Sequence, residues 1–130
     1  MNLYLRKKTQ KGKIKGNFNL KNLNLYWGII SLNSGFITNK QLETSKFIIN
    51  KFMKKLGKYN ILIKCTKSLT KKSFKTRMGS GKGLIELYVG IIKKKKLLFE
   101  ISKISMNLIY KLTKILSYKL PFKLQFINKK

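Results

Sequence analysis

The sequence lacks several of the side chains that enzymes use for acid–base and metal chemistry. Its 130 residues include no His and no Asp, and its only carboxylate side chains belong to Glu43, Glu86 and Glu100. A single cysteine, Cys65, excludes an internal disulfide and a cysteine-based zinc site, and we expect it to be a small buried residue on a strand. We therefore expect structural roles for the three glutamates, and neither catalysis nor a metal or cofactor.

Negative charge is scarce, and positive charge is abundant. Thirty-one Lys and Arg residues face three acids, which gives a formal net charge of +28. A small domain with this charge repels itself unless a polyanion neutralises it. The basic residues run along the whole chain and do not flank one apolar anchor, which favours nucleic acid over an anionic membrane as that polyanion.

Long apolar segments are also missing. The uncharged run from Asn22 to Asn39 is about long enough to span a bilayer, but it is too rich in Asn, Ser and Gly to insert. Met1 to Arg6 lacks the apolar stretch of a secretory signal. We expect no membrane insertion. A hydrophobic content of 43% is typical of a globular protein, and the length suits one domain.

Alanine is absent, Val89 and Pro121 are the only residues of their types, and Lys outnumbers Arg 29 to 2. Folding gives no reason to exclude Ala, because it is the best helix former. Codons for Ala, Pro and most Arg are rich in G and C, whereas those for Lys, Asn, Ile and Phe are rich in A and T. This bias indicates an A+T-rich genome. We expect a mitochondrial protein, with a plastid or an A+T-rich bacterial cytoplasm as alternatives.

The first 21 residues are basic, contain several glycines and have little apolar periodicity. A disordered tail would fit this pattern, but the charge favours an arm that becomes ordered on RNA. We accordingly divide the chain into an arm, residues 1–21, and a single domain, residues 22–130. The candidate RNA-binding residues of the arm are Arg6, Lys7, Lys8, Lys11, Lys13 and Lys15.

Two segments have the spacing of amphipathic helices. The first begins at Thr38, which forms a T-x-x-Q capping box with Gln41, and we expect it to end at Gly57. The second is capped by Ser105 and ended by Pro121. The expected core-facing residues are Leu42, Ile49, Phe52, Met53 and Leu56 in the first, and Leu108, Ile109, Leu112, Ile115 and Leu116 in the second.

Alternating or β-branched segments predict about five strands. They comprise residues 23–32, 59–65, 84–92, 97–101 and 122–126. The third and fourth, joined by Lys93–Lys96, predict a β-hairpin on which Glu86 and Glu100 meet lysines. The patterns together predict an α+β fold, in which both helices cover one face of a mostly antiparallel sheet.

Residues 66–83 have no periodic pattern, and a loop of this length is usually functional. The run Gly79–Gly83 is not a nucleotide-binding phosphate loop of the form G-x-x-x-x-G-K-[ST], since Thr76 stands at its first position and Gly83 follows Lys82. Its three glycines would still let the backbone approach a phosphate or ribose closely, while Arg77 and Lys82 supply charge.

The run from Lys75 to Gly83, with Glu86 three residues later, resembles the R-M-G-x-G-K-G signature of the family of ribosomal protein sixteen of the large subunit. Lys11–Gly16 is similar to the basic K-G-R-x-R-G arm of that family. Lys119–Lys123 resembles its K-L-P-x-K motif. The resemblance covers nearly the whole chain, although Lys replaces Arg at many basic positions.

The resemblance implies an α/β-hammerhead-type sandwich bound to large-subunit rRNA. It also implies a loop that points toward tRNA near the peptidyl-transferase region, and neighbouring ribosomal proteins as partners rather than a stand-alone homo-oligomer. Because the family's start coincides with Met1–Arg6, we expect an organelle-encoded gene without a cleaved presequence. The loop residues carried over are Arg77, Met78, Gly79, Gly81, Lys82 and Gly83.

Two other functions are compatible with parts of the sequence. Charge alone would permit an organellar architectural DNA-binding protein, but the irregular glycine loop and single-domain sandwich speak against it. A membrane-active protein would rest on the amphipathic segment 105–119, whose apolar stripe is more simply explained as a core face.

Overall fold

The computed structural model describes residues 7–19, 22–54 and 56–129, so Arg6 of the predicted arm lies outside the described residues. Two helices and seven strands occur within these ranges. In chain order they are β1 (Trp27–Ser31), β2 (Gly35–Thr38), α1 (Asn39–Met53), β3 (Tyr59–Ile61), β4 (Lys67–Lys71), β5 (Leu84–Ile92), β6 (Leu97–Ile101), α2 (Met106–Lys119) and β7 (Leu124–Asn128).

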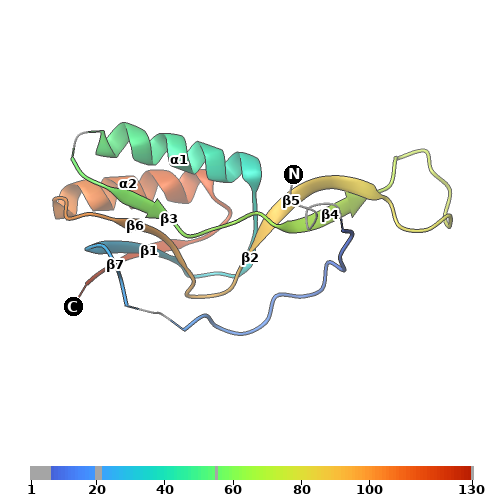
Figure 1. The fold of residues 1–130 in the computed structure, drawn as a ribbon, viewed down its shortest axis with the longest axis horizontal. Coiled ribbons are helices and arrows are strands. Elements are labelled where there is room, and N and C mark those ends of the chain that lie inside the picture. The colour runs from blue at the N-terminus through green and yellow to red at the C-terminus, as the bar shows by residue number, and fades with distance from the viewer. Residues whose placement is uncertain (1–6, 20–21, 55, 130) are drawn as a thin grey trace.

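The larger part of the molecule, the body, is a four-stranded antiparallel sheet with two helices. Its strand order is β3-β6-β1-β7. Both helices lie on the same face of this sheet (Figure 1). The predicted α+β architecture, with two helices on one face of an antiparallel sheet, is confirmed.

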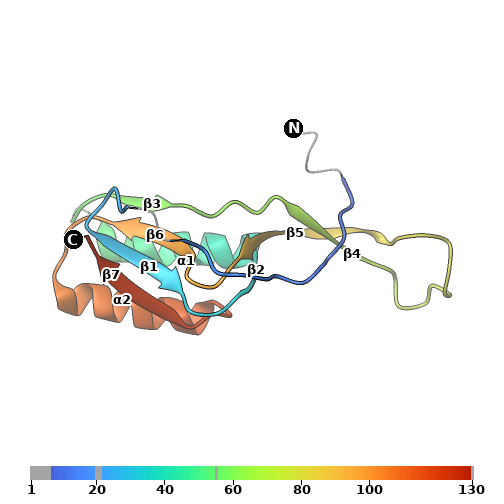
Figure 2. The ribbon, with the colours of Figure 1, turned by 90° about the horizontal axis from the view of Figure 1, so that it is seen from below.

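The smaller part, the extension, is a three-stranded antiparallel sheet of order β2-β5-β4 together with residues 72–83, the loop. It projects from one end of the body and carries the loop at its far end (Figures 1 and 2). The molecule is therefore elongated, with the loop remote from the helices.

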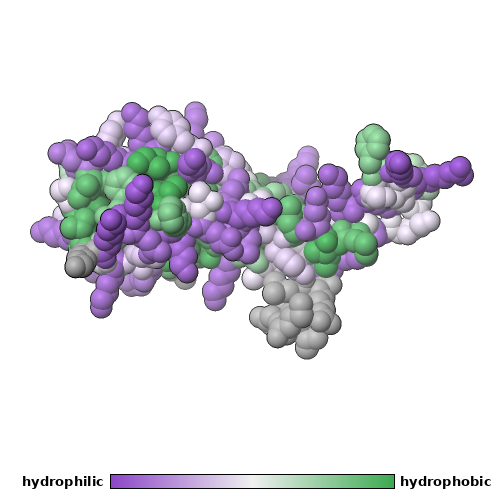
Figure 3. All heavy atoms as spheres, turned by 90° about the horizontal axis from the view of Figure 1, so that it is seen from above, coloured by the Kyte–Doolittle hydropathy of each residue, from purple (hydrophilic) through white to green (hydrophobic). Residues whose placement is uncertain are grey.

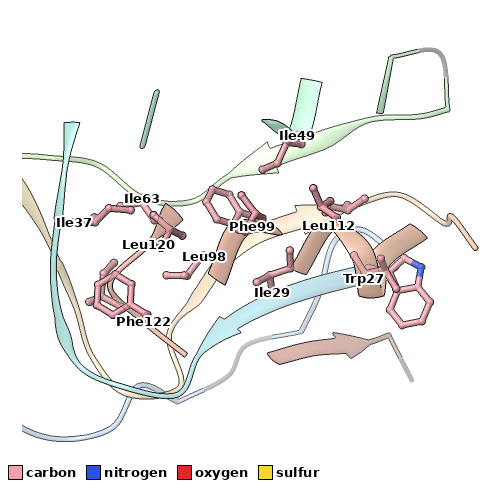
Figure 4. Close-up of a cluster of buried hydrophobic side chains, with 14 of the residues drawn as sticks. Trp27, Ile29, Ile37, Ile49, Ile63, Leu98, Phe99, Leu112, Leu120 and Phe122 are labelled. Carbon is pink, nitrogen blue, oxygen red and sulfur yellow. The ribbon is translucent and has the colours of Figure 1, made fainter. Parts of the chain in front are cut away.

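The core of the body fills the space between the helices and the sheet. Ile49 of α1 and Leu112 of α2 meet Ile29 and Phe99 of the central strands, and all four are fully buried (Figure 4). Both predicted helix starts are confirmed. The Gln41 amide donates to Thr38 Oγ1 at 3.3 Å and the Gln41 side chain accepts from the Thr38 amide at 3.0 Å.

The predicted hairpin of residues 84–101 is wrong, although both strands have the predicted bounds. β5 pairs with β2 and β4 in the extension, whereas β6 pairs with β1 and β3 in the body. The lysine segment 93–96 carries the chain from one sheet to the other. The Lys95 amide donates to the Ser31 carbonyl at 2.8 Å, and the Ser31 amide donates to the Lys96 carbonyl at 3.1 Å. These bonds tie the segment to β1 and so prevent a simple reversal.

Several predicted boundaries also change. α1 ends at Met53, before Gly57, and Leu56 is exposed rather than part of the stripe. β3 stops at Ile61, so Cys65 lies outside it; the thiol is half-buried and donates to the Ile37 carbonyl, and burial raises its pKa. β4 occupies part of the segment predicted as irregular.

The two strand glutamates have different surroundings. Glu86 lies 4.0 Å from the Lys71 ammonium on the surface, as expected, in a pair of little consequence for stability. Glu100 does not meet a lysine. It is only 2% exposed and accepts hydrogen bonds from the Asn24 amide at 3.1 Å and from Asn60 Nδ2 at 3.5 Å. These donors satisfy the buried carboxylate and fix the chain entering β1.

Candidate nucleic-acid interface

The loop consists of exposed residues with a strong positive charge. Every residue from Lys71 to Lys82 is exposed. Residues 72–83 contain four cationic side chains and no carboxylate. Met78, one of the predicted site residues, is 101% exposed. None of these side chains contributes to the core, so the loop has the composition of a surface that contacts a polyanion.

The three loop glycines have two different roles. Gly79 and Gly81 have backbone φ angles of +99° and +83°, which residues with a side chain rarely adopt. A Cβ at either position would have no heavy atom within 4 Å. Gly83 is held by packing instead. A Cβ there would lie 2.7 Å from the Lys71 carbonyl carbon and oxygen. Gly83 thus closes the loop against the end of β4, whereas Gly79 and Gly81 shape its open part.

The loop surrounds a hollow of about 320 Å³. Its lining combines ammonium groups, hydroxyls and glycine backbone, from Lys71, Lys72, Ser73, Thr76, Gly79, Ser80, Gly81, Lys82, Gly83 and Leu84. The Lys72 ammonium crosses it and donates to the Gly79 carbonyl at 2.5 Å. Such groups can bind phosphate and ribose oxygens without reading a base. Arg77 lies outside this lining and projects into solvent.

The arm lies against the base of the loop, so the two predicted sites come together. Lys8 Nζ donates to the Lys82 carbonyl at 3.3 Å, and the Lys82 ammonium donates to the Thr9 carbonyl. The buried Ser68 of β4 anchors the same segment: its hydroxyl donates to the Lys7 carbonyl at 2.6 Å, and its own carbonyl accepts from Thr9 Oγ1 at 3.2 Å. Arm and loop therefore form one basic surface at the extension.

Ser68 and Thr9 were not predicted as site residues. Ser68 falls in a segment whose sequence has no clear strand periodicity, and a serine hydroxyl that binds backbone carbonyls leaves no sequence signal. Two of the contacts involve main-chain carbonyls of the arm, those of Lys7 and Thr9, which any residue could provide. Only the three-dimensional arrangement reveals them.

The rest of the arm runs back along the molecule to the body (Figure 2). The Lys11 carbonyl accepts a hydrogen bond from the Lys67 ammonium. Lys13 and Lys15 are exposed. The Phe18 amide then donates to the Lys94 carbonyl at 2.8 Å. The arm thus links the loop to the lysine segment 93–96.

Lys96 is the least exposed cation of that segment. Its Nζ donates to the Ile91 carbonyl at 3.1 Å and lies 6.0 Å from the centre of the Phe18 ring. Burial, together with the nearby charge of Lys93, lowers the pKa of Lys96. Lys93, Lys94 and Lys95 remain exposed and extend the basic surface to the junction of body and extension.

The described ranges hold no cluster of three or more His, Cys, Asp or Glu side chains that could bind a metal ion. Among the helices of residues 7–19, 22–54 and 56–129, none has the length and apolar character needed to cross a membrane.

A family comparison agrees with the structural features. The model of the family described as ribosomal protein L16p/L10e matches residues 4–127. This range includes the arm from residue 4 onward, the loop, and all the elements of the body apart from the last residue of β7. The match continues through the sheets and helices and is not limited to the glycine motif. The chain belongs to the L16p/L10e family of large-subunit ribosomal proteins.

Proposed function

We propose that this chain is a structural constituent of the large ribosomal subunit that binds rRNA and presents its loop to tRNA near the peptidyl-transferase region. Membership of a ribosomal protein family supports the structural role. The observation that carries the finer proposal is the docking of the arm on β4 and Lys82, which joins two basic segments 74 residues apart in sequence. One continuous cationic surface can follow an RNA backbone further than either segment alone.

Within this proposal, the arm of residues 1–21 supplies rRNA phosphate contacts and residues 22–130 form one rRNA-binding domain. Lysine ammonium groups act as flexible point charges, so they suit irregular phosphate paths better than planar bidentate recognition. The contact residues are Lys7, Lys8, Lys11, Lys13 and Lys15 of the arm, with Arg6 preceding them in sequence.

The loop has a separate part in this proposal. Arg77 and Lys82 approach tRNA phosphates, and Met78 lies at the contact surface. Gly79 and Gly81 let the backbone come close to ribose, while Gly83 keeps the loop in shape. All of these steps are binding and positioning, and no bond is made or broken by the chain.

A sedimentation experiment tests the main proposal. We expect a tagged full-length chain to sediment with large subunits in a sucrose gradient and to be released when the rRNA is digested. Cross-links from position 77 should reach tRNA in translating ribosomes. Sedimentation with DNA, and release by deoxyribonuclease alone, would instead favour an architectural DNA-binding role.

We also propose a mitochondrial ribosome as the site of action. The absence of Ala and the excess of Lys over Arg support an A+T-rich genome. The test is cell fractionation: the chain should be found with ribosomes of purified mitochondria, and its coding sequence should lie in the mitochondrial DNA. Recovery only with plastid or cytoplasmic ribosomes would contradict the compartment and leave the ribosomal role intact.

A further inference from the structure

An aromatic side chain of the loop is fully exposed. Phe74 is 104% exposed, more than any other large hydrophobic residue of the described ranges. It lies in a tight turn in which the Thr76 amide donates to the Ser73 carbonyl at 3.1 Å and the two hydroxyls of Ser73 and Thr76 are hydrogen-bonded. Phe74 and Lys75 are thus the two central residues of a hydrogen-bonded turn.

The surroundings of the ring are cationic. Lys72, Lys75 and Arg77 lie within three residues of Phe74 and are all exposed. Figure 3 shows hydrophobic atoms beside strongly hydrophilic ones at this end of the molecule. A cationic or neutral apolar partner would leave these charges without compensation. A partner that combines an apolar flat face with negative charge would satisfy both.

A nucleotide combines these two properties. Base faces stack on aromatic rings, and adjoining phosphates pair with Lys and Arg. In a double helix the base faces are covered by their neighbours, and the grooves expose only edges and backbone. The partner of an isolated ring must therefore be a base that is unpaired and open on at least one face.

We propose that Phe74 stacks on an unpaired nucleobase, with Lys75 and Arg77 on the neighbouring phosphates. This inference rests on the proposed RNA-binding function and deepens it, because it assigns to the loop a base contact in addition to phosphate and ribose contacts. The inference assigns no base contact to Phe47, an aromatic residue of α1 that is 71% exposed on the helical face of the body.

The test uses the full-length chain and three probes. They are a short single-stranded oligoadenylate, an abasic oligomer of the same length, and an A-form RNA duplex. We expect Phe74→Leu to weaken oligoadenylate binding by about 5- to 150-fold, the range that stacking of one base provides. Binding of the abasic oligomer and the duplex should not change. Phe74→Trp should bind as tightly as Phe74, and Phe47→Leu, the matched control, should have no effect.

Three outcomes would overturn the inference. One is equal binding of oligoadenylate by Phe74 and Phe74→Leu, and another is an equal loss for all three probes. The third is found in assembled subunits, where benzoylphenylalanine in place of Phe74 should cross-link to RNA; cross-links to protein alone would mean that the ring contacts a neighbouring protein. Failure of the unmodified chain to bind any RNA would contradict the proposed function itself, so the two failures are distinguishable.

Discussion

The body and the loop are built on opposite principles. In the body, Ile29, Phe99 and Leu112 are fully buried between two helices and a sheet. In the loop, each residue from 72 to 82 is exposed. Burial of apolar surface stabilises the body. The loop obtains almost nothing from burial, yet ordering it costs conformational entropy. The difference shows that the body is stabilised by its own core, and it supports our proposal that RNA binding orders the loop.

Salt should produce the largest effect. Its dependence tests whether the RNA-binding charges lie on the arm and loop rather than on the body. If about six to ten phosphates are neutralised, rRNA affinity should fall by roughly three to five decades between about 50 and 200 mM salt. Changing Lys7, Lys8 and Lys11 to Gln should reduce the salt slope by about one per lost phosphate contact. Binding isotherms at several salt concentrations measure it.

The matched control changes three exposed cations of the body, Lys46, Lys51 and Lys54, to Gln. This variant should keep the slope of the unmodified chain. An equal loss of slope in both triple variants would show that the helical face of the body binds RNA as much as the arm does.

A core substitution should have the next largest effect and is confined to the body. Leu112→Ala leaves a cavity between α2 and the sheet and should reduce the free energy of unfolding by roughly 2–5 kcal/mol. Leu84→Ala, at an exposed leucine where the loop joins β5, should change it by less than about 0.5 kcal/mol. Thermal or denaturant unfolding checks both, and comparable losses would mean that the extension shares the stability of the body.

How far sequence predicts structure also differs between the two regions. The capping residues Thr38 and Ser105 and the apolar spacing of α2 locate the helices, because helical periodicity is a local property. Strand partners are not local. The bounds of β5 and β6 follow from the sequence, yet their placement in different sheets depends on contacts of residues 93–96 with Ser31.

The candidate site shows the same limit. Its charge and glycines are visible in the sequence, and the family resemblance identifies the loop. The docking of the arm is not visible, since it depends on main-chain carbonyls of Lys7 and Thr9 that have no sequence signal. The distinct packing role of Gly83 emerges only when the backbone of Lys71 is seen beside it.

Substitutions at Gly83 and Gly79 test which glycine packs against the sheet and which shapes only the loop. Gly83→Ala forces a Cβ against the Lys71 backbone and should destabilise the extension by about 1–3 kcal/mol. Hydrogen exchange should then accelerate in β4 and β5. Gly79→Ala has open space around it and a cost of about 1–2 kcal/mol from its backbone angle alone, so its effect should stay within the loop. Equal acceleration of β4 by both variants would contradict the division of roles.

Ser68 tests whether the arm is docked before RNA binds. Ser68→Ala removes the hydrogen bond to the Lys7 carbonyl and should cost about 0.5–1.5 kcal/mol. Tryptic cleavage in the arm of the free chain should become faster. Ser117→Ala, which removes an exposed hydroxyl bond on α2, is the control and should leave cleavage unchanged. Unchanged cleavage in Ser68→Ala would show that the arm is not held by β4.

The smallest effect on stability, and the sharpest test of the comparison, should come from Arg77→Ala. Arg77 is exposed and lies outside the lining of the loop hollow, so its removal should change the free energy of unfolding by less than about 0.5 kcal/mol. Lys82 differs, because its ammonium also binds the Thr9 carbonyl and helps to hold the arm. Arg77→Ala should therefore leave subunit incorporation intact and weaken tRNA accommodation, whereas Lys82→Ala should in addition loosen the arm. Melting curves and translation by reconstituted subunits measure both properties. If Arg77→Ala melts much lower yet translates normally once incorporated, the loop is a structural element and the contrast between body and loop does not hold.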